Sequence, residues 1–263
     1  MLKKLLVPIL ILGLFMVVGC DKDNPTEPTP TEFEVIQPAL DAYTGGAQAP
    51  TVSAADLYAN MNDGDASNDY FVVSVRSATD YAKGHVPGAI NIPWKEIPLT
   101  ANLAKLPTDK KIICYCYTGH TAAIATTILN SLGYEAYNLK FAIMSWTTDA
   151  TVRTASAFNE DTDAHDYPVE TTVNAPSTTY DIPVTDFTTS KDETEIVRAA
   201  AEYYVTNQSP TIAAATLYAN LNDGDTSNDP VIVSVRSEAH YALGHIPGAI
   251  NIPWREICKE EKN

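Results

Sequence analysis

Short apolar runs and segments with helical spacing follow one another along residues 50–140. The apolar runs, flanked by turn-forming residues, predict buried strands at 70–75, 89–92, 111–115 and 136–139. The segments between them predict helices at 54–61, 79–83, 99–106 and 119–132. Strands that alternate with helices are typical of a parallel sheet with helices on both faces. We therefore expect an α/β fold.

Much of this pattern occurs twice. Residues 50–97 align with residues 210–257 at a constant offset of 160 without gaps, and 34 of the 48 positions are identical. Identity at this level indicates a duplication. Weaker similarity extends upstream in both copies. We therefore expect a first unit over residues 34–190, with its core at 51–150, and a second unit over residues 194–263.

The second unit repeats only the first part of the pattern. A full copy would continue past residue 263, so the strand and loop equivalent to those after residue 110 have no counterpart in the sequence. Three arrangements of this incomplete repeat stay open. It docks on the first unit, pairs with another chain, or stays partly disordered. A truncation of the recorded sequence stays open as well.

The first twenty residues follow a different pattern. Two lysines precede an apolar run over residues 5–18, and Gly19 and Cys20 follow. The run is shorter than the roughly 20 apolar residues of a membrane span, and a small residue precedes the cysteine. Residues 1–20 resemble the signal peptide and lipobox of bacterial lipoproteins, which implies removal of residues 1–19 and acylation of Cys20. A plain signal anchor with an incidental cysteine is the alternative.

The lipoprotein resemblance implies a membrane-anchored protein of the cell envelope that faces the periplasm or the exterior. Residues 20–33 are rich in Pro, Thr and Glu without apolar periodicity, so we expect a tether there. The formal charge is −16, and loss of Lys3 and Lys4 would bring it to about −18. Such an acidic chain repels nucleic acid and anionic headgroups, so we expect no nucleic-acid partner.

A cysteine lies at the end of one predicted buried strand. Cys116 follows the run at 111–115, and a loop with Gly119 leads into the next predicted helix. Ligands of a parallel sheet bind at the carboxyl ends of its strands. Backbone N–H groups of such a loop, with the positive end of the following helix, stabilise a thiolate and hold anions. We therefore expect Cys116 to be a nucleophile in an anion-binding loop.

The other cysteines predict neither a metal site nor a disulfide. Cys114 and Cys116 lie two residues apart along one strand, a spacing of roughly 6–7 Å, which is too far for an unstrained disulfide. We expect Cys114 to be a buried core thiol. Cys258 aligns with Pro98 and is not a second Cys116. Without a CxxC spacing or paired histidines, no zinc site is expected.

The motifs in this part of the chain resemble the rhodanese family. Its single-domain members carry a loop of the form C-x-x-G-x-[R/T], which residues 116–121 match. The motif V-R-[ST] followed by G-H-[IV]-P-G-A-x-N-[IV]-P matches residues 75–93 and again residues 235–253. The motif N-L-x-x-x-[IV]-x-x-W matches residues 138–146. The resemblance implies a rhodanese-like parallel sheet flanked by helices, followed by an incomplete repeat.

The resemblance implies a sulfurtransferase. Cys116 would take the outer sulfur of a small donor such as thiosulfate or a persulfide, and a thiol or cyanide would accept it. No cofactor and no metal are implied. The substrate-binding residues would be those of the loop, Tyr117, Thr118, Gly119, His120 and Thr121. The alternative is a non-catalytic rhodanese-like module that binds a protein partner or a small anion, and the oligomeric state stays open.

The sequence departs from the family at several positions. Ser74 replaces a common acidic residue, the loop lacks arginine, and Phe141 and Ala142 replace a common glycine pair. The loop without arginine puts thiosulfate in doubt as the natural donor. Phosphatases and arsenate reductases of the same fold need C-x5-R, and Ala122 occupies that arginine position. This argues against phosphoryl transfer, which depends on such a clamp.

Two residue pairs recur in both units. Arg76 and His85 correspond to Arg236 and His245, although the second unit has no cysteine loop. We therefore expect structural roles for all four. For His120 two interpretations stay open, namely that it polarises the donor or that it faces solvent.

Overall fold

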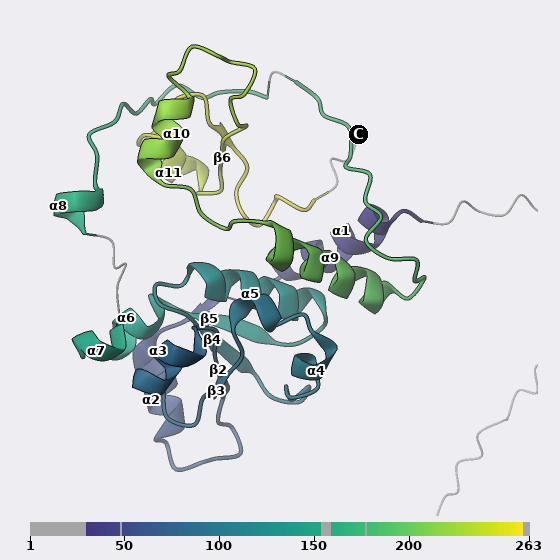
Figure 1. Cartoon of the computed structure of the whole chain (residues 1–263), viewed down its shortest axis with the longest axis vertical. Helices are drawn as coiled ribbons and strands as arrows, with labels where there is room; N and C mark the ends of the chain where they lie inside the picture. Colours follow the sequence, from purple (N-terminus) through teal and green to yellow (C-terminus); the bar gives the residue numbers. More distant parts are fainter. Residues whose placement is uncertain (1–29, 48, 154–158, 177, 260–263) are drawn as a thin grey trace, which may run out of the picture.

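The computed structural model describes residues 30–47, 49–153, 159–176 and 178–259 (Figure 1). Cys20, the predicted signal peptide and most of the predicted tether lie outside these ranges. Within them, no helix combines the length and the apolar character that crossing a membrane requires.

A five-stranded parallel sheet forms the centre of the first unit, with the strand order β1-β5-β4-β2-β3 (Figure 1). The strands are β1 (Thr51–Val52), β2 (Phe71–Ser74), β3 (Ile90–Asn91), β4 (Ile112–Tyr115) and β5 (Ala136–Leu139). Every residue of β4 is buried, because the strand lies inside the sheet and both of its faces are covered. The predicted α/β fold with a parallel sheet is confirmed.

The helices around this sheet include the four that the sequence predicts, namely α2 (Ala54–Met61), α3 (Ala78–Lys83), α4 (Thr100–Leu103) and α5 (His120–Ser131), and two that it does not predict, the 3-10 helix η1 (Trp94–Glu96) and α6 (Ala142–Trp146). The helix α4 is shorter than the predicted 99–106, because residues 104–106 continue as hydrogen-bonded turns. Two short helices follow α6, namely α7 (Ala150–Arg153) and α8 (Glu160–Asp163).

A helix that the sequence did not predict precedes the sheet. It is α1 (Glu32–Thr44), and it begins inside the predicted tether, so that prediction is wrong for Glu32 and Phe33. The Thr31 side chain accepts the Glu34 N–H, and the Glu34 carboxylate accepts the Thr31 N–H. This capping box starts the helix. The buried carboxylate of Glu32 also accepts the N–H groups of Phe187 and Thr188.

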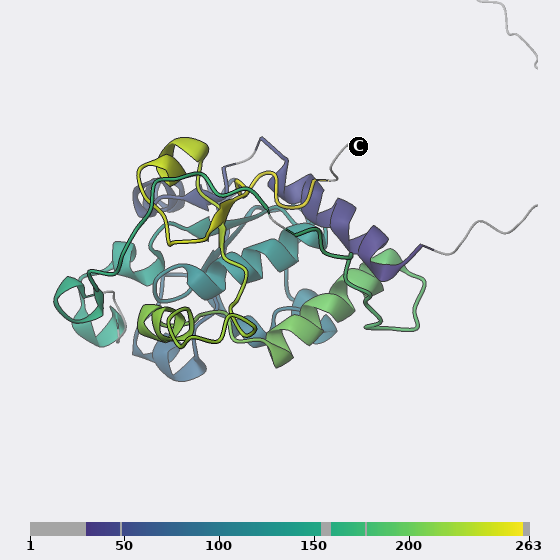
Figure 2. The same cartoon turned by 90° about the horizontal axis from the view of Figure 1, so that it is seen from above.

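The first helix of the second unit packs on the first unit. This helix, α9 (Glu193–Asn207), contacts α1, α5 and η1. The helices α1, α5 and α9 form one layer in Figure 2. Ala201 and Val205 belong to the hydrophobic core of the first unit, and Val205 is only 1% exposed. Of the three arrangements that the sequence left open for the second unit, this contact corresponds to docking on the first unit.

The rest of the second unit forms a smaller body above this helix layer in Figure 1. It contains α10 (Ala214–Asn220), β6 (Val233–Ser234), α11 (Glu238–Ala242) and β7 (Ile250–Asn251). The strand β6 pairs in parallel with β7, in the register that β2 and β3 use. Among the described residues, no strand pairs with the other edge of β6, which corresponds to the edge of β2 that holds β4.

Candidate active site

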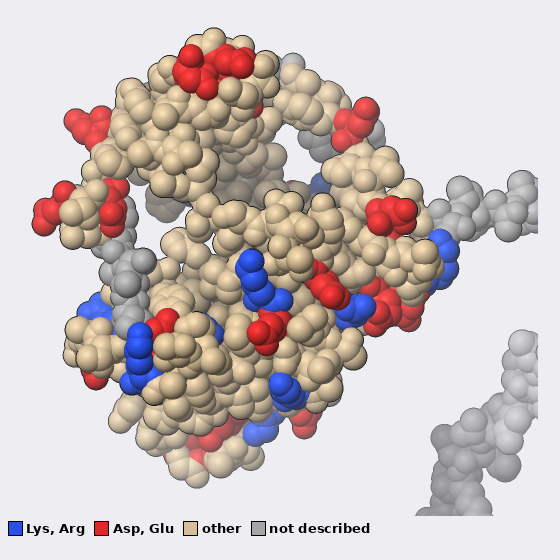
Figure 3. Space-filling model, viewed as in Figure 1, with Lys and Arg blue, Asp and Glu red and all other residues tan. Residues whose placement is uncertain are grey.

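Charged side chains are unevenly distributed over the two units. Figure 3 shows Asp and Glu side chains over both units on the face in view, whereas the Lys and Arg side chains lie mainly over the first unit. The whole chain carries 33 acidic and 17 basic residues. On a chain with this excess of acidic residues, a site for an anion must be built by local groups.

Cys116 directly follows β4 and begins the loop that leads into α5. Its Sγ accepts a hydrogen bond from the backbone N–H of Gly119 at 3.1 Å. Its carbonyl accepts the N–H of Ile143 at 3.3 Å. The cysteine is 2% exposed. The N–H aimed at Sγ favours negative charge on the sulfur, because a backbone amide dipole is fixed toward it.

Gly119 sets the shape of this loop. Its φ of 111° lies in the left-handed region, where a residue with a Cβ atom is strained. Its carbonyl accepts Asn138 Nδ2 at 3.0 Å, which ties the loop to β5. It also caps α5, whose first N–H groups have no acceptor within the helix. The positive end of α5 therefore lies at the loop that contains Cys116.

Tyr117 is held by residues from a distant part of the first unit. Its Oη donates to Asp80 Oδ2 at 2.5 Å and accepts the Ser77 N–H at 3.3 Å. Asp80, on α3, also accepts Lys83 Nζ at 2.6 Å and the Ser77 hydroxyl at 2.9 Å. The hydrogen bonds from Lys83, Tyr117 and Ser77 hold the pKa of Asp80 well below its usual range. The carboxylate therefore stays ionised and anchors the loop.

Sequence reasoning missed Asp80 as part of the site. The counterpart of Asp80 in the second unit is His240, but Ala78 and Thr79 beside it also differ between the units, so the sequence alone does not single Asp80 out. The second unit has no Tyr117 equivalent among its described residues.

The other loop residues are more exposed. His120 is exposed, and its Nδ1 lies 3.0 Å from Thr118 Oγ1. Thr118 and Thr121 are half-buried. The segment 116–121 contains no Lys or Arg, so its polar groups are backbone amides, hydroxyls and one imidazole.

Arg76 is fully buried next to this loop. It donates to the carbonyls of Gly84 and Val152 and to the hydroxyl of Ser74. Its guanidinium carbon lies 6.0 Å from the ring centroid of Tyr117. Carbonyl dipoles and aromatic faces thus surround the positive charge of Arg76. Ser74 occupies the position at which the family commonly has an acidic residue.

The three other recurring residues hold turns. His85 is exposed, and its Nδ1 lies 3.0 Å from the Tyr81 carbonyl. Arg236 donates to the Gly244 carbonyl at 2.6 Å but is exposed. His245 is buried, with Nε2 3.3 Å from the Glu170 carboxylate. Each of these contacts joins a side chain to a backbone carbonyl or, for His245, to a carboxylate, and the structural roles of these residues stay a prediction.

The residues that replace the family's glycine pair have unusual backbone angles. Phe141 and Ala142 have φ values of 60° and 48°, in the region that non-glycine residues avoid. The next residue, Ile143, donates its N–H to the Cys116 carbonyl. Backbone strain therefore lies directly beside the cysteine.

Cys114 and Cys116 occupy different environments although both are buried. Burial raises the pKa of the Cys114 thiol to about 12. Cys114 therefore stays protonated at neutral pH and is a poor nucleophile. Neither cysteine forms a disulfide within the described part of the chain.

Comparison with known proteins gives sulfurtransferases among the relatives. The chain is 28% identical over 81 residues to a sulfurtransferase of Allochromatium vinosum, covering 30% of this chain and 74% of the relative. It is 32% identical over 113 residues to the human thiosulfate:glutathione sulfurtransferase, covering 38% and 95%. The chain spans less than half the length of several other curated relatives.

A solved structure and a family model are also similar to parts of the chain. The structure of a human single-domain sulfurtransferase is 31% identical, covers 38% of this chain and 96% of that one, and has a TM-score of 0.33. The family model for the rhodanese-like domain matches residues 53–149 and 213–263. These two segments make up more than half of the chain, which therefore belongs to the rhodanese-like domain family.

Proposed function

We propose that this protein is a sulfurtransferase that carries sulfane sulfur as a persulfide on Cys116. The observation that carries the proposal is the position of Sγ at the end of β4, with the Gly119 N–H directed at it. In the first step the Cys116 thiolate forms a bond to the outer sulfur of the donor. The donor's S–S bond breaks, and its leaving group departs with the bonding electron pair.

The second step returns Cys116 to its starting state. A thiolate or cyanide acceptor attacks the outer sulfur of the persulfide and takes it. The S–S bond of the persulfide breaks, and the electron pair returns to the Cys116 sulfur. The loop amides and the positive end of α5 stabilise the negative charge on sulfur in both steps, so no cofactor is required.

The composition of the loop favours a persulfide donor over thiosulfate. Thiosulfate is a dianion, and strong binding of such anions usually involves paired donors from arginine. Residues 116–121 supply no Lys or Arg. A small organic persulfide carries less charge and needs fewer cationic groups.

A non-catalytic binding module is the second candidate. The observation that favours it is the low exposure of Cys116, only 2%, because buried thiols react slowly. In this alternative the loop amides bind a small anion or a partner's acidic group and the cysteine is inert.

A transfer assay separates the two candidates. The protein is given glutathione persulfide or thiosulfate with cyanide as the acceptor, and thiocyanate is measured. The sulfurtransferase forms thiocyanate, Cys116→Ser abolishes it, and Cys114→Ser retains it. No thiocyanate from either donor, with the protein folded, would support the binding module.

We also propose that the chain is exported and acylated at Cys20. The support is the sequence of residues 1–20. In a bacterial host, metabolic labelling with a fatty-acid analogue should mark the protein, and Cys20→Ser should remove the label. An unlabelled protein that retains residues 1–19 would favour the signal anchor.

A further inference from the structure

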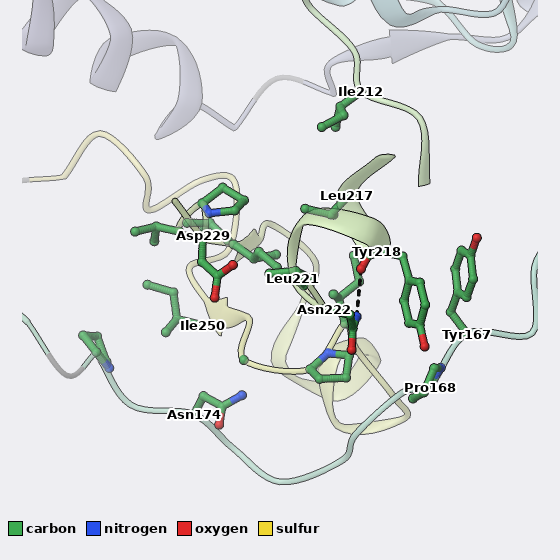
Figure 4. A pocket seen from close by; sticks show the side chains of 18 of the residues that line it. Tyr167, Pro168, Asn174, Ile212, Leu217, Tyr218, Leu221, Asn222, Asp229 and Ile250 are labelled. Atoms are coloured by element: carbon green, nitrogen blue, oxygen red, sulfur yellow. Dashed lines mark hydrogen bonds between the residues drawn. The ribbon is translucent and has the colours of Figure 1, made fainter. Parts of the chain in front are cut away.

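The groups that can act on the Cys116 sulfur lie in the first unit. The pocket in Figure 4, of about 1210 Å³, belongs to the second unit. Its lining comes from residues 167–252 and contains no cysteine. Leu217, Leu221 and Ile250 surround the space in that view. The groups that position the sulfur therefore come from the sheet and the loop of the first unit.

Asn138 lies on the strand next to the one that precedes the cysteine. This strand, β5, lies between β1 and β4, and Asn138 pairs in register with Thr51 on one side and with Cys114 on the other. Its backbone N–H donates to the Pro50 carbonyl at 3.0 Å. A residue held between two neighbouring strands is a rigid base for its own side chain.

The Asn138 side chain reaches the loop through one hydrogen bond. Nδ2 donates to the Gly119 carbonyl at 3.0 Å, whereas Oδ1 is buried without a hydrogen-bond partner in the part of the chain that the structure describes. A Cβ atom on Gly119 would lie 3.6 Å from Nδ2, so the amide packs directly against the glycine. A flipped amide would turn Oδ1 toward a carbonyl that is also an acceptor. The hydrogen bond therefore fixes the orientation of the amide.

Gly119 connects this contact to the sulfur. Its carbonyl also accepts the Ala123 N–H at 2.9 Å, which is the first hydrogen bond of α5. Its own N–H donates to Cys116 Sγ at 3.1 Å. The carbonyl of one residue is thus held by β5 and α5, while its N–H is directed at the sulfur. Because glycine has more conformational freedom than any other residue, loss of the Asn138 contact would let this N–H turn away from Sγ.

We propose that Asn138 is a positioning residue for Cys116. By holding the Gly119 carbonyl, it keeps the Gly119 N–H directed at Sγ, where negative charge is present on the attacking thiolate and returns when the acceptor takes the sulfur. This role rests on the proposed function, because it concerns the same sulfur. Asn138 acts through Gly119 and contacts no substrate, so it affects the rate of bond formation and not the binding of the donor.

Asn130 forms the same kind of link at the other end of α5. Its Nδ2 donates to the carbonyls of Thr126 and Ala136 at 2.8 Å each, and its Oδ1 accepts the Ala136 N–H at 3.4 Å. Ala136 is the first residue of β5, so this asparagine ties the end of the helix to the start of the strand. That end lies away from the Cys116 loop, which makes Asn130 a matched control.

The test compares Asn138→Leu with Asn130→Leu in the full chain, because leucine is close to asparagine in size but cannot donate a hydrogen bond. With glutathione persulfide as the donor, Asn138→Leu should lower the maximal single-turnover rate of persulfide formation on Cys116 about tenfold and leave the half-saturating donor concentration unchanged. Removing a donor outright costs more, roughly 10²–10³-fold, whereas here the Gly119 N–H stays near the sulfur. Asn130→Leu should lower the stability in urea more and leave both kinetic values unchanged.

Two further measurements complete the test. Alkylation of Cys116 by iodoacetamide, followed by the mass of its peptide, needs no sulfur donor and should slow by the same factor in Asn138→Leu. Asn138→Asp keeps the size and the polarity of the side chain, but an ionised carboxylate cannot donate. Its loss in both rates should therefore be at least as large.

Three results would overturn the positioning role. They are equal rates for the wild type and the folded Asn138 variants, a change in the half-saturating donor concentration alone, and equal losses in Asn138→Leu and Asn130→Leu. A wild-type Cys116 that neither forms a persulfide nor is alkylated would overturn it together with the proposed function. A wild-type chain that forms no persulfide, but is alkylated faster than Asn138→Leu, would contradict the sulfurtransferase and support the positioning role.

Discussion

Tyr117 Oη and Asp80 Oδ2 are joined by a hydrogen bond of 2.5 Å across 37 residues of sequence. It connects the loop after β4 to α3, and Asp80 is also bonded to Lys83 and Ser77. A hydrogen bond to an ionised acceptor is stronger than one between neutral groups. The shape of the loop next to Cys116 therefore depends on a carboxylate outside the loop.

Tyr117→Phe should loosen this loop. It removes the hydrogen bond to Asp80 but keeps the ring, and we expect a loss of about 1 kcal/mol in unfolding free energy because Asp80 is partly exposed. The rate of persulfide formation on Cys116 should fall as well. Urea denaturation and single-turnover kinetics measure the two effects.

Tyr134→Phe is the matched control for that variant. Tyr134 donates to the Leu103 carbonyl at 3.3 Å, away from the loop. It should alter stability slightly and leave the rate of sulfur uptake unchanged. Equal rates for Tyr117→Phe and Tyr134→Phe would contradict a role of Tyr117 in positioning the loop.

Asp80→Asn should remove a contribution to stability that depends on pH. The pKa of Asp80 in the folded state lies well below that of an unfolded chain, about 3.9. The contribution is therefore complete above pH of about 4 and is lost as the pH falls through the lower folded value. The stability gap between wild type and Asp80→Asn, measured in urea, should be constant from pH 7 to 5 and shrink toward pH 3. A gap that widens on acidification would refute this linkage.

Local patterns predicted the strands β2, β3, β4 and β5, the cysteine loop and Gly119, because neighbouring residues determine these features, whereas the two-residue edge strand β1 was too short to be predicted. The hydrogen bond from Tyr117 to Asp80 was not predicted, because it joins segments that only the folded sheet brings together. The same reason applies to Val205, which lies in the second unit by sequence and in the core of the first unit by packing. The apolar content of a helix does not reveal which surface it covers.

Val205→Ala should destabilise the first unit, although the substituted residue belongs to the second unit by sequence. Removing two methyl groups from a side chain that is 1% exposed should cost about 2 kcal/mol. Thr206→Ala, at an exposed position on the same helix, is the control. Both are measured by urea denaturation with hydrogen exchange at β4 and α5. If Val205→Ala left exchange in the first unit unchanged, α9 would not be part of its core.

Phe141→Gly should be more stable than Phe141→Ala. Both remove the exposed ring, but only glycine relieves the strain of a φ of 60°. After allowance for the greater freedom of glycine in the unfolded chain, the difference should be about 1 kcal/mol in thermal or urea unfolding. An alanine variant of equal or greater stability would show that this backbone conformation carries no strain.

The most direct test of the central claim is the intact mass of the protein after incubation with a sulfane-sulfur donor and removal of the donor. The wild-type chain should gain the mass of one sulfur atom and lose it on addition of cyanide. Cys114→Ser should gain the same mass, and Cys116→Ser should gain none. A folded wild-type chain that gains no sulfur from persulfide, polysulfide or thiosulfate, or a gain that persists in Cys116→Ser, would contradict the assignment of Cys116 as the sulfur carrier.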